Sequence, residues 1–250
     1  MCIRDRIRGM RLKDKVILIT ASTRGIGLAI TKACAEEGAI VYMGARNLER
    51  AGQRADELNQ KGFRVRYVYN DAYEPETYDS MIEEVVNKEG RIDVLVNNFG
   101  TSDPKKDMDI GHTDCIDFLQ IVNTNLTSVF AASQAAIKHM EAQGRGSIIN
   151  ISSVGGLVPD ISQVAYGTSK AAINYLTKLI AVQEARHNIR CNAVLPGMTA
   201  TDAVQDHLSD EFREFFLKHT PIRRMGKPEE IAAAVVYFAV SYTHLTLPTN

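Results

Sequence analysis

Three side chains have the types and the spacing of a proton-transfer site. Tyr166 and Lys170 are four positions apart, so both lie on one face of a helix. A lysine ammonium beside a tyrosine phenol favours the phenolate, which lowers its pKa from about 10 and lets it exchange a proton with an alcohol. Ser153, thirteen positions before Tyr166, could hold the oxygen of that alcohol. The Tyr166–Lys170 spacing alone is a weak signal, because about half a match is expected by chance.

The segment from residue 20 to residue 27 has the composition of a phosphate-binding turn. Small residues and glycines separate an apolar segment from a helical pattern, so the backbone can approach a phosphate and the helix amides can bind its charge. A tight turn without a ligand has the same composition, but the position after the first apolar segment favours a dinucleotide site. Ala21 stands where glycine is common, and a left-handed backbone is less comfortable for alanine. The candidate residues are Thr20, Ala21, Ser22, Thr23, Arg24, Gly25, Ile26 and Gly27.

The end of the second apolar segment indicates which dinucleotide is bound. A ribose 2′-hydroxyl is usually bound by a carboxylate about 20 residues beyond the glycine loop, whereas a 2′-phosphate is bound by arginine. Here the segment ends at Arg46 without a carboxylate, and Arg24 in the glycine loop could close on the same phosphate. The alternative is that both arginines are only solvated surface residues. We therefore expect NADP(H) as the cofactor.

Short β-branched segments alternate with longer helical patterns, and these elements must position the site. Continuous apolar strands separated by helices predict a parallel sheet with helices on both faces. The predicted fold class is therefore α/β, a single Rossmann-type, doubly wound domain. Strands are expected at Lys15–Thr20, Ile40–Met43, Val65–Tyr69, Ile92–Asn97, Ser147–Ser152 and Ile189–Leu195. Helices are expected at Gly25–Glu37, Leu48–Lys61, Glu76–Lys88, Thr124–Ala142, Val164–His187 and Pro228–Ala239.

Composition excludes several other classes of protein. With 250 residues, 45% of them apolar and 24% charged, the chain is long enough for one large globular domain. A net charge of −1 gives no electrostatic footprint for nucleic acid or for an anionic membrane. The four cysteines are scattered without a CxxC pair, so neither disulfides nor a metal site are expected. There is no membrane span or signal peptide in the pattern, and we expect a cytoplasmic protein.

Together, these motifs resemble the short-chain dehydrogenase/reductase family from about residue 12 to residue 239. Asn97-Asn98-Phe99-Gly100 and Pro196-Gly197 add to the resemblance, although Phe99 departs from the alanine that is usual there. The resemblance implies that Ser153, Tyr166 and Lys170 are catalytic and that Asn125 holds a water in the proton relay. Taken singly, Asn125 could instead be a helix cap and Ser153 a satisfied hydroxyl. The further implied cofactor contacts are Asp71 at the adenine, Asn98 and Gly100 along the cofactor, Tyr166 and Lys170 at the nicotinamide ribose, and Pro196 and Gly197 before Thr199 and Thr201 at the nicotinamide amide.

The implied reaction is hydride transfer between a secondary alcohol carbon and a nicotinamide ring. Tyr166 would take the hydroxyl proton, Ser153 would stabilise the developing carbonyl oxygen, and Lys170 would orient the ribose and lower the pKa of Tyr166. Four segments resemble the 7α-hydroxysteroid dehydrogenases of bile-acid-metabolising bacteria, which implies a bile acid as substrate. These segments are Val158–Ser162, Asn188–Gly197, Asp210–Arg213 and Pro228–Ala232.

Alternatives remain at the level of substrate and activity. Within the family, the alternative is a 3-oxoacyl thioester (acyl-carrier-protein) reductase. From another class of protein, the alternative is a non-catalytic NADP(H)-binding regulator. An apolar set between residues 202 and 225 could be a lid over a hydrophobic substrate, or could only pack its helix onto the core. This set comprises Leu208, Phe212, Phe215, Phe216 and Leu217.

The two ends differ from the rest of the chain. A single nucleotide sequence can encode residues 1–5, and the reverse complement of that same sequence can encode residues 240–244. We therefore expect residues 10–239 to form the domain, and residues 1–9 and 240–250 to be non-native read-through. The last strand of the family would then be missing, which leaves the strand at Ile189–Leu195 with an open edge. Family members are commonly homotetramers, and the resemblance implies that state for the full-length form.

Overall fold

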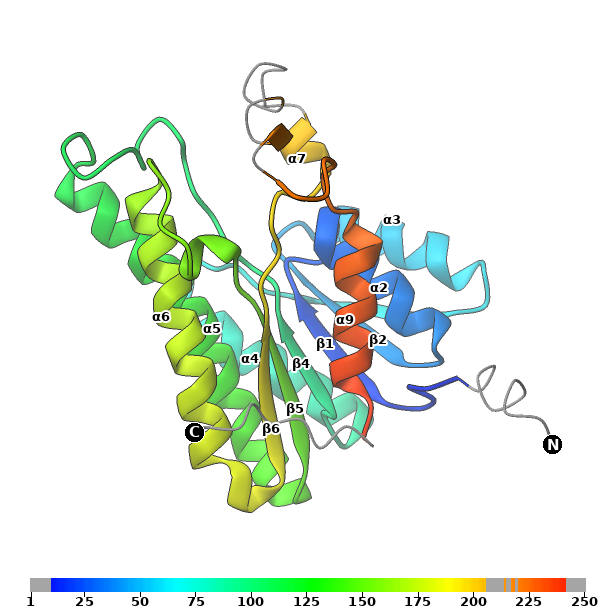
Figure 1. The fold of residues 1–250 in the computed structure, drawn as a ribbon. Helices are drawn as coiled ribbons and strands as arrows, with labels where there is room; N and C mark the ends of the chain where they lie inside the picture. Colours follow the sequence, from blue (N-terminus) through cyan, green and yellow to red (C-terminus); the bar gives the residue numbers. More distant parts are fainter. Residues whose placement is uncertain (1–9, 206–213, 215–216, 219, 242–250) are drawn as a thin grey trace.

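The computed structural model describes residues 10–205, 214, 217–218 and 220–241. Its centre is a six-stranded sheet in which all neighbouring strands are parallel. This confirms the predicted doubly wound α/β fold. The strands are β1 (Val16–Thr20), β2 (Ile40–Ala45), β3 (Arg64–Tyr69), β4 (Val94–Asn97), β5 (Gly146–Ile151) and β6 (Ile189–Val194), in the spatial order β3-β2-β1-β4-β5-β6 (Figure 1).

The strand order reverses between β1 and β4. From β1 the chain builds outward through β2 to β3, and then it crosses back to place β4 on the other side of β1. Loops that leave the carboxyl ends of β1 and β4 therefore run in opposite directions and open a crevice, which is where doubly wound sheets bind ligands. The glycine loop follows β1, and Asn98 follows β4.

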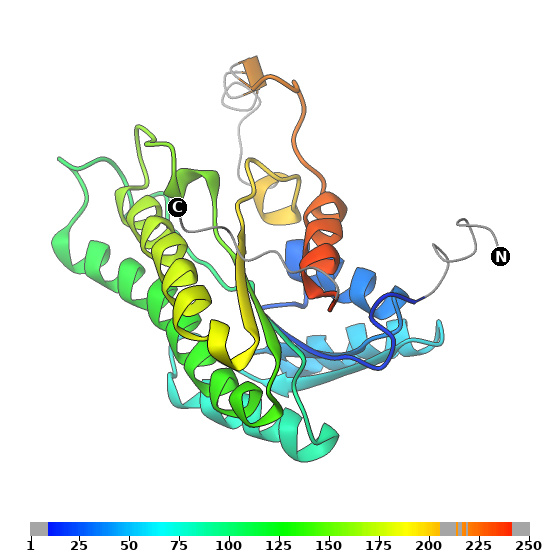
Figure 2. The same cartoon turned by 60° about the horizontal axis from the view of Figure 1, so that its bottom comes forward.

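Helices cover both faces of the sheet (Figure 1, Figure 2). On one face α2 packs against α9, and on the other α5 packs against both α4 and α6. Short helical segments lie at Val154–Gly156, at Ala185–His187 and at α7 (Asp202–Gln205). No helix in the described residues has the length and apolar character needed to cross a membrane. The main helices are α2 (Gly25–Glu36), α3 (Leu48–Asn59), α4 (Glu76–Glu89), α5 (Cys115–Gln143), α6 (Val164–Gln183) and α9 (Pro228–Ala239).

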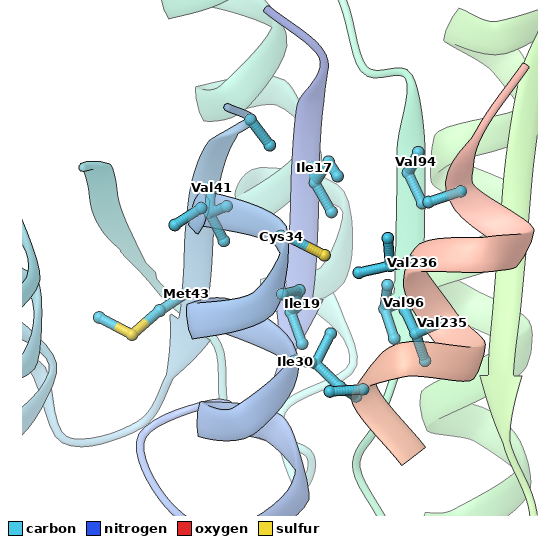
Figure 3. Packing of buried hydrophobic residues seen from close by; sticks show 14 of the residues in the cluster. Ile17, Ile19, Ile30, Cys34, Val41, Met43, Val94, Val96, Val235 and Val236 are labelled. Carbon is cyan, nitrogen blue, oxygen red and sulfur yellow. The ribbon is translucent and has the colours of Figure 1, made fainter. Parts of the chain in front are cut away.

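The core has two halves because successive residues of a strand point to opposite faces of the sheet. Ile17 and Ile19 of β1 face α2 and α9, where they meet Ile30 and Val236 (Figure 3). Leu18 points to the other face, into a cluster formed with α4, α5 and α6. The central strands β1 and β4 are therefore buried and apolar along most of their length, which is the pattern that predicted a sheet covered on both sides.

The first turns of α5 were predicted wrongly. The sequence pattern put the start of this helix at Thr124, whereas it begins at Cys115. Asp114 is its N-cap, and its side chain accepts a hydrogen bond of 2.7 Å from the backbone N–H of Ile116. Its first turns carry large apolar side chains that are exposed, Ile116 at 76% and Leu119 at 58%, so the apolar residues there do not mark a face buried on the core. Asn125 is therefore an interior residue of a long helix, and its interpretation as a helix cap is wrong.

Other boundaries differ by smaller amounts. The helix expected over Val164–His187 ends at Gln183, and a short helical turn follows before Asn188, whose φ is +59°. Gly90 and Gly144 end α4 and α5 in left-handed conformations, as expected for terminating glycines. Among the described residues β6 pairs only with β5, so it is an edge strand. The segments 1–9 and 242–250, and Leu208, Phe212, Phe215 and Phe216 of the predicted lid, lie outside the described residues.

Candidate active site

The loop after β1 is held against the loop after β4. The side-chain amide of Asn98 donates to the carbonyl oxygens of Thr20, at 3.1 Å, and Ala21, at 3.0 Å. In return, the hydroxyl oxygen of Thr20 accepts from the backbone N–H groups of Asn98, at 2.9 Å, and Phe99, at 3.1 Å. These four bonds join the two loops that border the crevice, so Asn98 shapes the glycine loop from across the sheet.

The glycine loop is shaped for an anionic group. Gly27 is packed so closely that an added Cβ would lie 2.6 Å from the carbonyl oxygen of Ala21 and 2.6 Å from the side-chain nitrogen of Asn98. Ala21 is left-handed with a φ of +51°, the conformation that the sequence suggested would be uncomfortable there. No side chain caps the start of α2, and its first turn has no acidic residue. The first N–H groups of α2 are therefore suited to bind a phosphate, as the dinucleotide interpretation requires.

The two predicted arginines have different surroundings. Arg46 is exposed at the end of β2, and its guanidinium lies 3.8 Å from a carboxylate oxygen of Asp71, which is largely buried after β3. Arg24 is also exposed, at the start of α2. The structure thus brings Arg46 and Asp71 together at the carboxyl ends of β2 and β3. These ends lie on the side of the crevice where an adenosine would extend from a phosphate at α2.

Tyr166, Lys170 and Ser153 meet at the carboxyl end of β5. Tyr166 and Lys170 lie in α6, and the Lys170 ammonium is 5.5 Å from the centre of the Tyr166 ring. The same ammonium donates a 2.9 Å hydrogen bond to the carbonyl oxygen of Ile151, the last residue of β5. Ser153 follows β5, and its hydroxyl lies near enough to the Tyr166 phenol to lower the pKa of that phenol. Gly100 lies against this group, because a Cβ there would be 2.9 Å from the Lys170 nitrogen.

Burial dominates the protonation of this group. Burial raises the pKa of Tyr166, while the neighbouring Ser153 hydroxyl acts in the opposite direction and lowers it. Burial also lowers the pKa of Lys170 from 10.5 to about 8. The sequence predicted a lowered pKa for Tyr166, and this prediction is wrong, because burial raises it. Spacing on a helix shows which groups are adjacent, whereas the loss of hydration depends on everything packed around them.

Asn125 lies beneath this group and is fully buried in α5. Its side-chain oxygen accepts from the backbone N–H of Thr101 at 2.9 Å. Its side-chain nitrogen donates to the carbonyl oxygen of Thr101 at 2.9 Å and to the hydroxyl of Ser169 at 3.0 Å. Asn125 therefore fastens the loop after β4 to α5 and α6. The predicted water-holding role of Asn125 stays a prediction.

The segment after β6 reaches the glycine loop from the other side. The hydroxyl of Thr199 is buried and donates to the carbonyl oxygen of Gly197 at 3.0 Å. Thr201 lies against Gly25, since its methyl carbon would be 3.4 Å from a Cβ added there. The predicted residues Pro196, Gly197, Thr199 and Thr201 thus belong to one segment that borders the crevice at the start of α2.

Sequence reasoning missed Asp107, a buried carboxylate bonded to the first turn of α6. Its partners, the backbone N–H groups of Ala165 and Tyr166, lie 58 and 59 positions along the chain. No local motif surrounds Asp107, so periodicity and spacing could not have found it.

A model of the short chain dehydrogenase family matches residues 15–211. The chain belongs to this family. It is therefore an oxidoreductase that acts on a hydroxyl or carbonyl carbon and uses NAD or NADP. This agrees with the glycine loop and with the Ser153, Tyr166 and Lys170 group described above.

Relatives of this short-chain dehydrogenase span nearly the same length. The 7α-hydroxysteroid dehydrogenase of Clostridium sardiniense is 50% identical over 229 residues, which cover 92% of this chain and 87% of that protein. A 3-oxoacyl-[acyl-carrier-protein] reductase of Thermotoga maritima is 39% identical over 233 residues, which cover 92% of each chain. The solved structure of a gluconate 5-dehydrogenase from Burkholderia cenocepacia, in complex with NADP and tartrate, is 32% identical with a TM-score of 0.86, covering 94% of this chain and 91% of that one.

The buried ammonium of Lys170 should make the stability of this short-chain dehydrogenase depend on pH. Because the pKa of Lys170 is lowered from 10.5 to about 8, the unfolded chain binds more protons than the folded chain between these values. The contribution of this group to the free energy of unfolding is then fully present above pH 10.5 and is lost as the pH falls through 8. Between pH 7 and pH 10, the free energy of unfolding of the wild type should rise by up to about 3 kcal/mol relative to Lys170→Met.

Urea unfolding of both proteins at several pH values measures this difference. Lys178→Met is the matched control, since Lys178 is an exposed lysine of the same helix. The control should keep a nearly constant difference from the wild type. A constant difference for Lys170→Met as well would contradict the expected effect of burial.

Proposed function

We propose that this chain oxidises the 7α-hydroxyl group of a bile acid with NADP⁺, and that Ser153, Tyr166 and Lys170 carry out the proton transfer. The observation that carries the catalytic part is the convergence of these three side chains beside the crevice at the carboxyl ends of the strands. The 7α-hydroxysteroid dehydrogenases of Clostridium sardiniense and Paraclostridium sordellii, 50% and 48% identical to this chain, support the substrate.

In the proposed reaction each side chain has one task. Ser153 holds the substrate hydroxyl and then the developing carbonyl oxygen, while Tyr166 takes the hydroxyl proton. Lys170, held by the carbonyl oxygen of Ile151, supplies a buried positive charge near the phenol and binds the nicotinamide ribose. When bound, the nicotinamide supplies the hydride acceptor for the alcohol carbon. The glycine loop, Asn98, Gly100 and the segment from Pro196 to Thr201 would hold the cofactor.

An apolar loop between Ser153 and Tyr166 supports a hydrophobic substrate. It joins β5 to α6, and four of its large apolar side chains are exposed to solvent. Exposed apolar groups beside the catalytic group suit a steroid better than a sugar or a charged thioester. These side chains are Val154, Leu157, Val158 and Ile161, with exposed fractions of 41%, 70%, 65% and 82%.

Arg46 and Arg24 support NADP(H) over NAD(H). Both are exposed, and Arg46 stands directly after β2, where a ribose 2′-phosphate would be bound. The carboxylate of Asp71 lies 3.8 Å from the Arg46 guanidinium but follows β3, so it does not occupy the end of β2. The NADP found with the 32% identical gluconate 5-dehydrogenase is consistent with this preference.

We also infer that the full-length protein is a homotetramer. An apolar groove between α5 and α6 supports this inference, because it leaves large apolar side chains on an open helix face. It is lined by Leu126, Thr127, Phe130, Ala172, Tyr175, Leu176 and Leu179.

A spectrophotometric assay tests the proposed substrate and cofactor together. NADPH formation should be rapid with a 7α-hydroxy bile acid such as chenodeoxycholate and at least about 100-fold slower with its 7β epimer or with NAD⁺. NADPH consumption with a 3-oxoacyl thioester should be slow. Faster turnover of the thioester would assign the chain to the reductase activity instead, and cofactor binding without turnover of either substrate would favour a regulator.

A further inference from the structure

The catalytic helix α6 does not cap its own N-terminus. The first N–H groups of a helix have no partner within it, and a side chain next to the helix usually supplies one. Gln163 occupies the cap position of α6 with a φ of +59°, and its side chain makes no capping bond. Tyr166 is only the third residue of this helix, so it lies in the turn that most needs a cap.

Asp107 supplies that cap from a distant loop. One of its carboxylate oxygens accepts from the backbone N–H of Ala165 at 2.8 Å, and the other accepts from the backbone N–H of Tyr166 at 2.9 Å. The neighbouring carbonyl oxygen of Met108 accepts from the N–H of Val164 at 3.1 Å. All three N–H groups of the first turn are therefore bound by two consecutive residues of the loop after β4.

The Asp107 carboxylate is buried, and the groups around it compensate its charge. Its side chain is 1% exposed, and a buried carboxylate is costly unless its charge is compensated. The hydroxyl of Ser102 donates to it at 3.2 Å, and within the described residues no cationic side chain pairs with it. The positive end of the α6 dipole and the two N–H groups are thus what balance the charge. A charge kept buried in this way couples the loop to the helix strongly.

The same loop is also fastened at its beginning. Asn125 holds Thr101 through both its backbone N–H and its carbonyl oxygen, and bonds to Ser169 of α6. The segment from Thr101 to Asp107 thus joins α5 to the first turn of α6, beside the group formed by Ser153, Tyr166 and Lys170. A displacement of this segment would be transmitted to the backbone of Tyr166 directly.

We propose that Asp107 is a positioning residue that holds the first turn of α6, and so keeps the Tyr166 phenol in hydrogen-bonding reach of Ser153 and of the substrate hydroxyl. The inference rests on the proposed role of Tyr166 as the proton acceptor. Asp107 does not touch the substrate; it acts through the backbone of Tyr166. Displacing a catalytic group by about 1 Å can cost about 100-fold in rate. Lys170 lies one turn further into α6 and has its own bond to Ile151, so cofactor binding depends on Asp107 much less.

The variants Asp107→Ala and Asp107→Asn test this role against a purely structural one. Asp107→Ala should lower kcat by about 30-fold or more while changing the affinity for NADPH, measured by fluorescence titration, by less than about twofold. Asp107→Asn keeps the size of the side chain and one accepting oxygen, and it should fall between the wild type and alanine. The number of NADPH sites per chain in the same titration reports the folded fraction, so a graded loss in kcat at full NADPH binding distinguishes positioning from loss of folded protein.

Asp114→Ala is the matched control, because Asp114 caps α5 with a single bond of 2.7 Å and α5 does not carry the phenol. It should lower the Tm about as much as Asp107→Asn and leave kcat within about twofold of the wild type. Unchanged kcat in a folded Asp107→Asn or Asp107→Ala protein would overturn the inference, and so would equal losses of kcat in the Asp107 and Asp114 variants. Tyr166→Phe, assayed in parallel, separates the two proposals: its full activity would refute the role of Tyr166 itself, whereas an inactive Tyr166→Phe with an active Asp107→Ala would refute only the positioning role.

Discussion

Tyr166→Phe should lower kcat by about 1,000-fold and leave the affinity for NADPH within about twofold of the wild type. The substitution removes only the phenolic oxygen, which is the proposed proton acceptor, and keeps the ring that packs beside Lys170. The loss should therefore be in the chemical step and not in binding or folding. Steady-state kinetics of alcohol oxidation, with cofactor titration by fluorescence, measures both quantities.

Tyr175→Phe is the matched control for this prediction. Tyr175 lies in the same helix, but its side chain is 64% exposed and faces the groove between α5 and α6. Its variant should keep kcat within about twofold. A Tyr166→Phe enzyme with more than about a tenth of the wild-type rate would rule out the phenol as the main proton acceptor.

Gly27→Ala should weaken NADP(H) binding by about 100-fold or more. The added methyl group would lie 2.6 Å from the carbonyl oxygen of Ala21 and 2.7 Å from the Cα of Ser22, both of which are backbone atoms that cannot rotate away. It would also lie 2.6 Å from the side-chain nitrogen of Asn98, which holds the glycine loop against β4. The loop must then move away from the start of α2, where the phosphates are expected.

Isothermal titration calorimetry with NADPH measures this loss. Gly52→Ala is the control, because a Cβ at this position in α3 would meet only the Tyr67 side chain at an ordinary contact distance of 3.5 Å. Alanine is also the better helix former, so Gly52→Ala should bind normally and be as stable as the wild type or slightly more stable. Normal NADPH binding by Gly27→Ala would show that the cofactor does not depend on this loop.

The fold followed from local patterns in most places. Strands such as β1 and β4 are runs of mostly apolar residues buried on both faces, and the breaks between strands contain glycines that end helices, as at Gly90 and Gly144. The start of α5 did not follow, because apolar side chains of its first turns, such as Ile116 and Leu119, face solvent and form no stripe buried on the core. Elements with a buried face were therefore predictable, and an element that begins in solvent was not.

The site shows the same division. The sequence by itself determined which chemical groups are available and which of them are neighbours within one element: the glycine loop, the Tyr166–Lys170 pair one turn apart, and Arg46 at a strand end. These follow from periodicity and from short-range spacing, which act within about one helical turn or one loop.

Only the tertiary structure decided how those groups are held and what state they are in. Asn125 and Asp107 bind partners that are 24 to 59 positions away, so no local pattern contains them. The raised pKa of Tyr166 and the lowered pKa of Lys170 come mainly from burial, which sums over every segment packed around α6. Hydration and long-range hydrogen bonding are properties of the packed chain, and for that reason they appear only when the chain has folded.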